Sequence, residues 1–175
     1  MKKLFAGLFA LGLSFSLNAN AISIDLIANN TNANVGDAVE VQVRISGLDG
    51  DIALGAYDVN FNYDTSLFSF DTITWGDTIK GNQLDLSGFG SWQESNSGTD
   101  WLNSIEFSFD DVSILESGQA SEFTLFSVLL NAIAIGSGNF SLTANTLGDA
   151  YANELFLDTI NGTTVNVNGV TVPEP

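Results

Sequence analysis

The chain has 175 residues and a formal net charge of −17, because 21 Asp and Glu residues face only four Lys and Arg residues. It contains no His and no Cys, which excludes disulfide bonds, the Ser-His-Asp and Cys-His nucleophile systems and nearly every transition-metal site. So few positive charges also exclude nucleic acid and anionic membrane surfaces as partners, because binding to either requires clustered Lys and Arg.

The N-terminal segment has the pattern of a secretory signal peptide. Two lysines precede an apolar run over residues 4–17, and Ala19 and Ala21 then supply the small residues of a cleavage site. The apolar run is too short to span a bilayer as a helix. We therefore predict a signal peptide over residues 1–21, with an uncleaved anchor as the alternative. The mature chain then starts at Ile22 and is extracellular or at the cell surface.

Alternation of apolar and polar residues with a period of two dominates the rest of the chain and predicts β-strands. The run over residues 123–135 is apolar on both faces and long enough for a helix, but its Phe, Val and Ile content and the glycines after it favour a central strand. In chain order, the predicted strands cover residues 23–28, 39–46, 57–64, 66–73, 105–110, 122–134, 139–146 and 164–172.

Clusters of Gly, Asn and Asp separate these runs at the spacing of an all-β sandwich, and there is no βαβ pattern. The stretch over residues 83–100, rich in Gly, Ser and Asn, is predicted as the one long loop. We therefore predict a single all-β domain over residues 22–172, built as a two-sheet β-sandwich.

Two of the predicted strands place polar side chains on one face. In the strand at 57–64, burial of the aromatic and aliphatic residues forces the alternate polar residues to the opposite side. The strand at 105–110 alternates in the same way, with Ile105 and Phe107 on one side. The residues that we predict to contact a protein partner are Asp58, Asn60, Asn62, Glu106 and Ser108. The alternative is that they form only the solvated side of an antiparallel sheet.

Aromatic residues of the predicted loop are candidates for carbohydrate binding. Phe89, Trp92 and Trp101 lie in or beside residues 83–100, where exposed rings stack on sugar faces. The alternative is that these rings fold back over the end of the sandwich and complete its core.

Calcium is the one metal that the composition favours, because carboxylate and amide oxygens lie in predicted turns. The best candidate ligands are Asp149, Asn153 and Glu154, although their spacing does not match an EF-hand. The alternative is ordinary turn chemistry, in which Asp and Asn bond to nearby backbone. Close pairs of carboxylates arise by chance among 21 acidic residues, so they indicate no glycosidase, and we predict that the protein is not an enzyme.

The order of these features resembles a cohesin domain. The first half holds Gly36-Asp37-Ala38-Val39-Glu40-Val41, then the strand from Ala56 through Tyr57-Asp58 to Tyr63-Asp64. The second half holds a Phe-rich strand near Phe107, an apolar strand near Phe126, Phe140-Ser141-Leu142 and the segment from Asp149 to Leu155. The chain departs from the family pattern at Thr65, where a proline is usual, and in residues 83–100.

The resemblance implies a flattened jelly roll of about nine strands, with one sheet face that captures a dockerin module. Asp58 matches a position where cohesins often place a polar contact residue, whereas Ala56 replaces another polar one. The function implied is a secreted, non-catalytic protein-interaction module in an extracellular or polysaccharide-associated assembly. A carbohydrate-binding β-sandwich that uses the loop aromatics is the alternative.

The last residues, Val172-Pro173-Glu174-Pro175, are similar to the start of a PEP-CTERM sorting signal. We expect residues 173–175 to be the beginning of such a signal, truncated here, with an accidental match as the alternative. The resemblance implies a surface or matrix protein of a Gram-negative bacterium.

Overall fold

A computed structural model describes residues 21–49 and 52–169 of the chain. Residues 1–20 and 170–175 lie outside this part, so the predicted signal peptide and the predicted sorting signal remain predictions from the sequence. No helix of the described part is long and apolar enough to cross a membrane.

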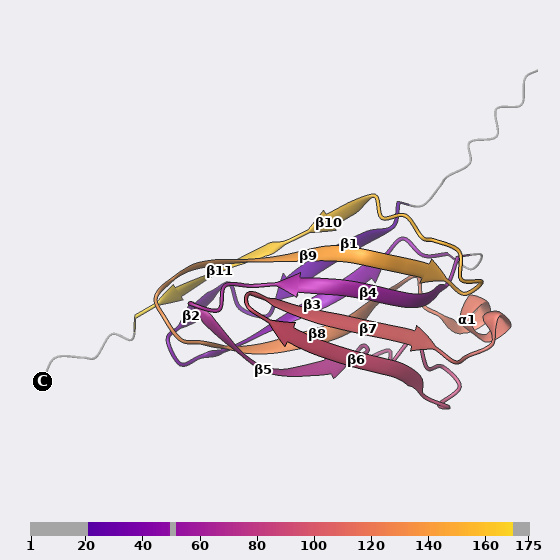
Figure 1. Cartoon of the computed structure of the whole chain (residues 1–175), viewed down its shortest axis with the longest axis horizontal. Coiled ribbons are helices and arrows are strands. Elements are labelled where there is room, and N and C mark those ends of the chain that lie inside the picture. Colours follow the sequence, from indigo (N-terminus) through magenta and orange to yellow (C-terminus); the bar gives the residue numbers. More distant parts are fainter. Residues whose placement is uncertain (1–20, 50–51, 170–175) are drawn as a thin grey trace, which may run out of the picture.

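The described residues form two β-sheets packed face to face (Figure 1), which confirms the predicted all-β sandwich. The first sheet has the order β10-β1-β3-β8-β5, with bounds β1 (Ser23–Ala28), β3 (Ala38–Ser46), β5 (Phe68–Trp75), β8 (Glu122–Ala132) and β10 (Thr159–Asn161). The second has the order β2-β11-β9-β4-β7-β6, with bounds β2 (Asn32–Asn34), β4 (Leu54–Asn62), β6 (Ser91–Gly98), β7 (Trp101–Ser108), β9 (Gly136–Asp149) and β11 (Thr163–Asn168).

The number of strands differs from the prediction: the described residues contain eleven strands rather than about nine. Two of them, β2 and β10, have three residues each and pair in parallel with β11 and β1. Strands this short leave no alternation that a sequence pattern can detect.

The central strands follow the predicted alternation. In β3 every second residue from Val39 to Ile45 is buried, and the residues between them are half-buried. The long apolar run is a strand, as predicted: β8 pairs with β3 on one side and β5 on the other, and nearly all of it is buried. β8 lies inside its sheet rather than at the edge, and a register shift opposite Val43 and Arg44 interrupts its alternation.

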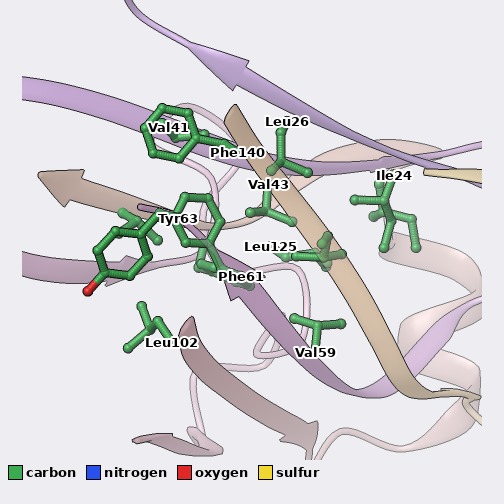
Figure 2. Close-up of a cluster of buried hydrophobic side chains, with 14 of the residues drawn as sticks. Ile24, Leu26, Val41, Val43, Val59, Phe61, Tyr63, Leu102, Leu125 and Phe140 are labelled. Carbon is green, nitrogen blue, oxygen red and sulfur yellow. The ribbon is translucent and has the colours of Figure 1, made fainter. Parts of the chain in front are cut away.

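The core between the sheets contains a cluster of aromatic rings among aliphatic side chains (Figure 2). Phe61 lies between Tyr63 and Phe140, with ring centroids 6.0 and 5.7 Å away, and Phe68 lies 4.9 Å from Phe140. Aliphatic side chains of β1, β3 and β8 fill the space opposite these rings. The four aromatic and aliphatic residues predicted to be buried in the strand at 57–64 are all in this core.

The prediction of a loop over residues 83–100 is wrong for the second half of this segment. Residues 91–98 form β6, which pairs antiparallel with β7 in a hairpin closed by Thr99 and Asp100. Asp100 adopts a positive φ of 62°, a conformation that Asp tolerates better than most residues in tight turns. Trp101 therefore begins β7 rather than ending a loop. A short helix that the sequence pattern did not predict, α1 (Val112–Gly118), follows β7 and buries Leu115.

The start of β1 is attached to the segment before β10. The backbone nitrogen of Ile22 donates a hydrogen bond of 2.9 Å to the Asp158 carboxylate, and the Asp158 nitrogen donates one of 2.8 Å to the Ile22 carbonyl. Gly47 lies beside the same point at a φ of 86°, and its Cα faces the backbone of Ala21 so closely that no Cβ fits. The first described residues are thus held by both neighbouring segments.

Candidate partner-binding face

The strands β9, β4, β7 and β6 turn one side to the core and the other to solvent. The solvent side of these four strands is called the outer face below. In β4 and β7 every second residue points inward and is buried, as Tyr57, Val59 and Leu102 are. The residues between these buried positions belong to the outer face. The register of the three strand pairs places them in four rows that run across the sheet.

The rows differ in chemistry from one end of the outer face to the other. The two central rows are mainly polar, and the two end rows carry large aromatic rings. In order from the end near α1, the rows are Trp92-Phe107-Ala56-Gly148, Glu94-Ile105-Asp58-Thr146, Asn96-Asn103-Asn60-Thr143 and Gly98-Trp101-Asn62-Ser141.

Hydrogen bonds join the polar residues of the central rows into a network. The Asn103 amide donates to Asp58 Oδ1 at 2.6 Å and to Asn60 Oδ1 at 3.0 Å. Asn145, beside the bulge of β9, donates to the same Asp58 oxygen at 2.9 Å. The Asn62 amide donates to the Thr143 hydroxyl at 3.2 Å. Because these amides are held by neighbours on three strands, the polar face has a defined arrangement of donors and acceptors before any partner binds.

The three polar residues of β4 therefore lie where the sequence predicted. Asp58, Asn60 and Asn62 are half-buried on the outer face, while Tyr57, Val59 and Phe61 point inward. Their role in partner binding remains a prediction, but the face that they form contains further polar groups from β7 and β9.

The placement of Glu106 and Ser108 on this face is wrong. Glu106 lies opposite Tyr57 in the register and is 0% exposed, because Leu102, Ser104 and Glu106 form the inward side of β7. Its carboxylate accepts hydrogen bonds from the Tyr57 hydroxyl at 2.9 Å, Asn82 at 2.6 Å, Ser91 at 2.5 Å and Gln93 at 2.8 Å. Ser108 is two residues after Glu106 and therefore lies on the same inward side of β7. Its Oγ accepts a hydrogen bond from the Asp110 nitrogen.

Glu106 can point inward because four neutral donors replace the water that would otherwise surround its carboxylate. A charged group needs such hydrogen bonds when it is buried. A lone alternating segment does not reveal which of its two sides finds such partners. The inverted phase also means that Ile105 and Phe107 lie on the outer face instead of in the core. Burial of Tyr57 beside the Glu106 charge raises the pKa of the phenol well above its ordinary value, first through desolvation and then through the charge and the hydrogen bond.

One end of the outer face carries a cluster of exposed rings. Trp92 and Phe107, which are 40% and 39% exposed, lie with ring centroids 5.2 Å apart. Phe109 meets Phe107 edge to face at 5.2 Å and is exposed as well. At the other end, the Trp101 ring covers Gly98, where a Cβ would collide with it.

The three residues predicted for carbohydrate binding do not form one platform. Trp92 and Trp101 are on the outer face but at opposite ends of the β6–β7 hairpin, roughly 20 Å apart at about 3.3 Å per residue. Phe89 projects into solvent from the segment before β6. Among the described residues, no ring contact joins any two of the three. Both tryptophans are more than a third exposed, so they do not complete the core.

The residues predicted for calcium lie in a tight turn after β9. The Asp149 carboxylate accepts bonds from the Tyr151 and Asn153 nitrogens, both at 2.8 Å, and from the Asn153 amide at 3.0 Å. Partial burial by itself would raise the pKa of Asp149, but these bonds outweigh it and hold the pKa below its ordinary value. Glu154 forms a backbone bridge with Gly148. Within the described ranges, no group of three or more acidic residues is arranged to hold a metal ion.

Sequence reasoning missed Asn103, Asn145 and Thr143, which complete the polar network. The signal for Asn103 was present, because Trp101, Asn103, Ile105 and Phe107 alternate with Leu102. The signal for Asn145 was not, because its position depends on a register shift between β4 and β9 that no local pattern encodes.

Comparisons with known proteins agree with this architecture. The cohesin domain model matches residues 24–167. A non-cellulosomal cohesin from the hyperthermophilic archaeon Archaeoglobus fulgidus shares 17% identity over 85% of this chain and 91% of its own, with a TM-score of 0.62. A type II cohesin domain from the cellulosome of Acetivibrio cellulolyticus shares 15% over 83% and 95%, with a TM-score of 0.67. A chain of a type I cohesin–dockerin complex from Clostridium thermocellum shares 15% over 83% and 99%, with a TM-score of 0.64. No curated protein sequence matches the chain.

Proposed function

The chain belongs to the cohesin family, and on that premise we propose that it is a secreted, non-catalytic module that captures a dockerin-like protein on its outer face. Similar structures from Clostridium thermocellum and Acetivibrio cellulolyticus are complexes of a cohesin with a dockerin. The predicted signal peptide supports a role outside the cell, in an extracellular or polysaccharide-associated assembly.

The observation that carries this proposal is the polar network of the outer face. Asp58, Asn60 and Asn103 come from two strands and bond to one another at 2.6–3.0 Å, so their side chains are already ordered. A partner that binds them loses little side-chain entropy at the interface, which favours recognition by a rigid protein surface. Rings at both ends of the face supply the apolar contact area that polar groups alone do not give.

The test is a charged substitution in the centre of the outer face. Asn60→Arg places a long cation among the polar rows without touching the core, so we expect the melting temperature to stay within about 2 °C of the unchanged protein. Binding to purified dockerin modules, measured by calorimetry against a panel of them, is expected to fall by at least about a hundredfold.

The matched control is Thr72→Arg, which adds the same side chain at an exposed position of β5 in the other sheet. We expect this variant to bind normally. If Asn60→Arg remains folded and binds with unchanged affinity, the outer face is not the capture surface. If Thr72→Arg abolishes binding instead, the capture surface belongs to the other sheet.

Carbohydrate binding is the alternative, and the separation of Phe89, Trp92 and Trp101 gives it no shared stacking platform. A glycan array with the unchanged protein and with Trp92→Ala separates the two functions. Glycan binding that is lost in Trp92→Ala and retained in Asn60→Arg would replace the proposed function.

A further inference from the structure

A pocket of about 430 Å³ opens on the outer face at the end nearest α1. It lies over the first row, where Trp92 and Phe107 are followed across the sheet by Ala56 and Gly148. Along this row the surface is high at the two large rings and low at the two small residues, which leaves a depression beside the rings. An ideal Cβ at Gly148 would meet the Ala56 Cβ only at 3.9 Å, so the floor of the pocket is open because these two positions lack bulk.

The walls of the pocket are mainly apolar. Ile105 and Phe107 of β7 form one side, Leu115 of α1 closes the end, and Ala150 and Ala152 of the turn after β9 form the other side. The ring cluster of Trp92, Phe107 and Phe109 continues this apolar surface outside the pocket. The volume is within the range of about 300–1,000 Å³ that is typical of protein sites for small ligands, and it accommodates a large side chain.

The charge around the pocket is negative and is not balanced by any cation. Asp58, Asp110 and Asp149 line it, as does the buried Glu106, whose carboxylate also accepts bonds only from uncharged donors. Their hydrogen-bond donors are uncharged: Asn103 and Asn145 for Asp58, residues 86 and 87 for Asp110, and residues 151 and 153 for Asp149. The described part of the chain has two positive side chains, and both are occupied elsewhere, as Arg44 pairs with the Glu122 carboxylate and Lys80 bonds to the Glu122 carbonyl.

We propose that this pocket receives an aromatic side chain of the captured protein, flanked in that protein by lysine or arginine that meets the three carboxylates at the rim. The inference rests on the proposed function, because it describes the chemistry of the partner that the outer face binds. Apolar walls select the ring, and the unbalanced carboxylates select the neighbouring cation. A second copy of this chain does not fit, because it would bring further negative charge to the same rim.

The pocket is tested without the natural partner, by titrating short capped peptides into the purified protein and following the backbone amide signals by NMR. Lys-Trp-Lys is expected to shift the signals of residues that line the pocket, such as Ala56, Ile105 and Leu115. Gln-Trp-Gln keeps the ring and removes the charges, and we expect it to bind about fivefold more weakly at low salt. Lys-Ala-Lys keeps the charges and removes the ring, and we expect it to produce no saturable shift at the pocket.

Variants of the protein give the second arm of the test. Ala56→Leu fills the floor of the pocket and is expected to weaken Lys-Trp-Lys by at least about tenfold. Ser141→Leu adds the same bulk at an exposed position of the last row and is expected to change affinity less than twofold. Asp58→Asn removes one rim charge and is expected to reduce the preference for Lys-Trp-Lys over Gln-Trp-Gln. The peptide series on the unchanged protein gives the answer even if Ala56→Leu does not fold.

Three results overturn the inference: equal affinities for Lys-Trp-Lys and Gln-Trp-Gln, unchanged binding by folded Ala56→Leu, or pocket shifts that depend on protein concentration and reveal self-association. None of them requires the natural partner, so each leaves the proposed function standing. Conversely, a dockerin module that binds Asn60→Arg normally overturns capture by the polar rows and leaves the peptide result intact.

Discussion

Glu106 is the residue whose environment departs furthest from what its chemical type suggests. A carboxylate that is 0% exposed normally needs a cation, yet its partners here are one phenol, one hydroxyl and two amides. These donors come from β4, β6 and the segment before β6, so the charge joins three parts of the chain. Replacing Glu106 by an apolar residue would leave the buried Tyr57 hydroxyl without an acceptor, at a cost of about 1–3 kcal/mol, and would remove the acceptor of the partly buried Asn82 and Ser91 donors.

The Tyr57–Glu106 pair makes stability depend on pH in the alkaline range. In the unfolded chain Tyr57 loses its proton at about pH 10, whereas burial and then Glu106 raise its pKa in the folded protein. Above about pH 10 the unfolded state therefore binds fewer protons than the folded state, and the free energy of unfolding decreases as pH rises. Urea denaturation between pH 8 and 11 should show this decrease, and Tyr57→Phe should make it smaller.

Some decrease should remain in Tyr57→Phe, because burial and Asp100 also raise the pKa of Tyr63. Tyr63→Phe is the matched comparison, since it removes a phenol that lies farther from Glu106. If Tyr57→Phe and the unchanged protein have the same dependence on pH, the pKa of Tyr57 is not raised in the folded protein.

At the level of single residues, the sequence predicted the inward side of β4 but not that of β7. Tyr57, Val59 and Phe61 are apolar enough that only one phase buries them favourably. In β7 one orientation of the strand would bury Glu106 and the opposite orientation would bury Phe107. The choice is made by Asn82, Ser91 and Gln93, which are 13–24 residues away in the sequence. A local pattern does not contain that information.

At the level of elements, the β6–β7 hairpin shows why a strand can escape detection. The eight residues of β6 have polar side chains except for Trp92 and Gly98, and the strand is exposed along most of its length because it is the edge of its sheet. Its inward residue Gln93 bonds to Glu106 instead of packing in the core. Such a strand is held by backbone pairing with β7 and does not need apolar side chains, so its Ser and Asn content resembles that of a loop.

The attachment of β1 to the segment before β10 leads to a prediction about the mature N-terminus. In a chain that begins at Ile22, the nitrogen that lies 2.9 Å from the Asp158 carboxylate is an ammonium group. The contact is then an ion pair, which at a half-exposed position is worth about 0.5–1 kcal/mol. We expect Asp158→Asn to lower the free energy of unfolding by about this amount when the chain begins at Ile22.

The matched comparison is the same substitution in a chain that begins at Ala21, where the Ile22 nitrogen is an amide. There we expect a smaller loss, because the asparagine oxygen still accepts the hydrogen bond. Urea denaturation of the four proteins measures both effects. An equal decrease in the free energy of unfolding in both chains would show that the N-terminal charge at Ile22 does not form a stabilising ion pair with Asp158.

At the level of the whole molecule, the fold class was predictable because alternation is a local property that repeats in most of the larger strands. The order of the strands was not, since sheet neighbours such as β4 and β9 are separated by more than 70 residues in the sequence. The polar half of the candidate site was partly predictable from β4 alone. The pocket was not, because Ala56 and Gly148 become neighbours only through that distant pairing.

The charge of the whole molecule predicts a strong effect of salt on stability. With a net charge of −17, self-repulsion opposes folding, and the screening length falls from about 30 Å at 0.01 M salt to about 3 Å at 1 M. We expect sodium chloride to raise the melting temperature by roughly 3–6 °C over this range. At matched ionic strength, calcium, magnesium and a chelator are expected to give equal values, because the Asp149 oxygens already accept bonds from its own turn.

Calorimetry in the three matched buffers checks this expectation. A melting temperature that rises with calcium but not with magnesium would contradict it, and would return Asp149, Asn153 and Glu154 to consideration as ligands. Asp149→Asn is the control, since a calcium effect that survives this substitution arises elsewhere in the chain.

The positions of the first and last strands have a mechanical consequence. The chain enters β1 and leaves β11 toward opposite ends of the long axis (Figure 1). Tension applied through these ends therefore runs along the strands, and β1 must slide past both β3 and β10 with all its pairings loaded together. Tension between the N-terminus and a cysteine introduced by Ser46→Cys would instead peel β1 from β3 one pair at a time, because Ser23 lies opposite Ser46. Single-molecule pulling should give a markedly higher unfolding force in the first geometry, and equal forces would show that β1 does not bear the load.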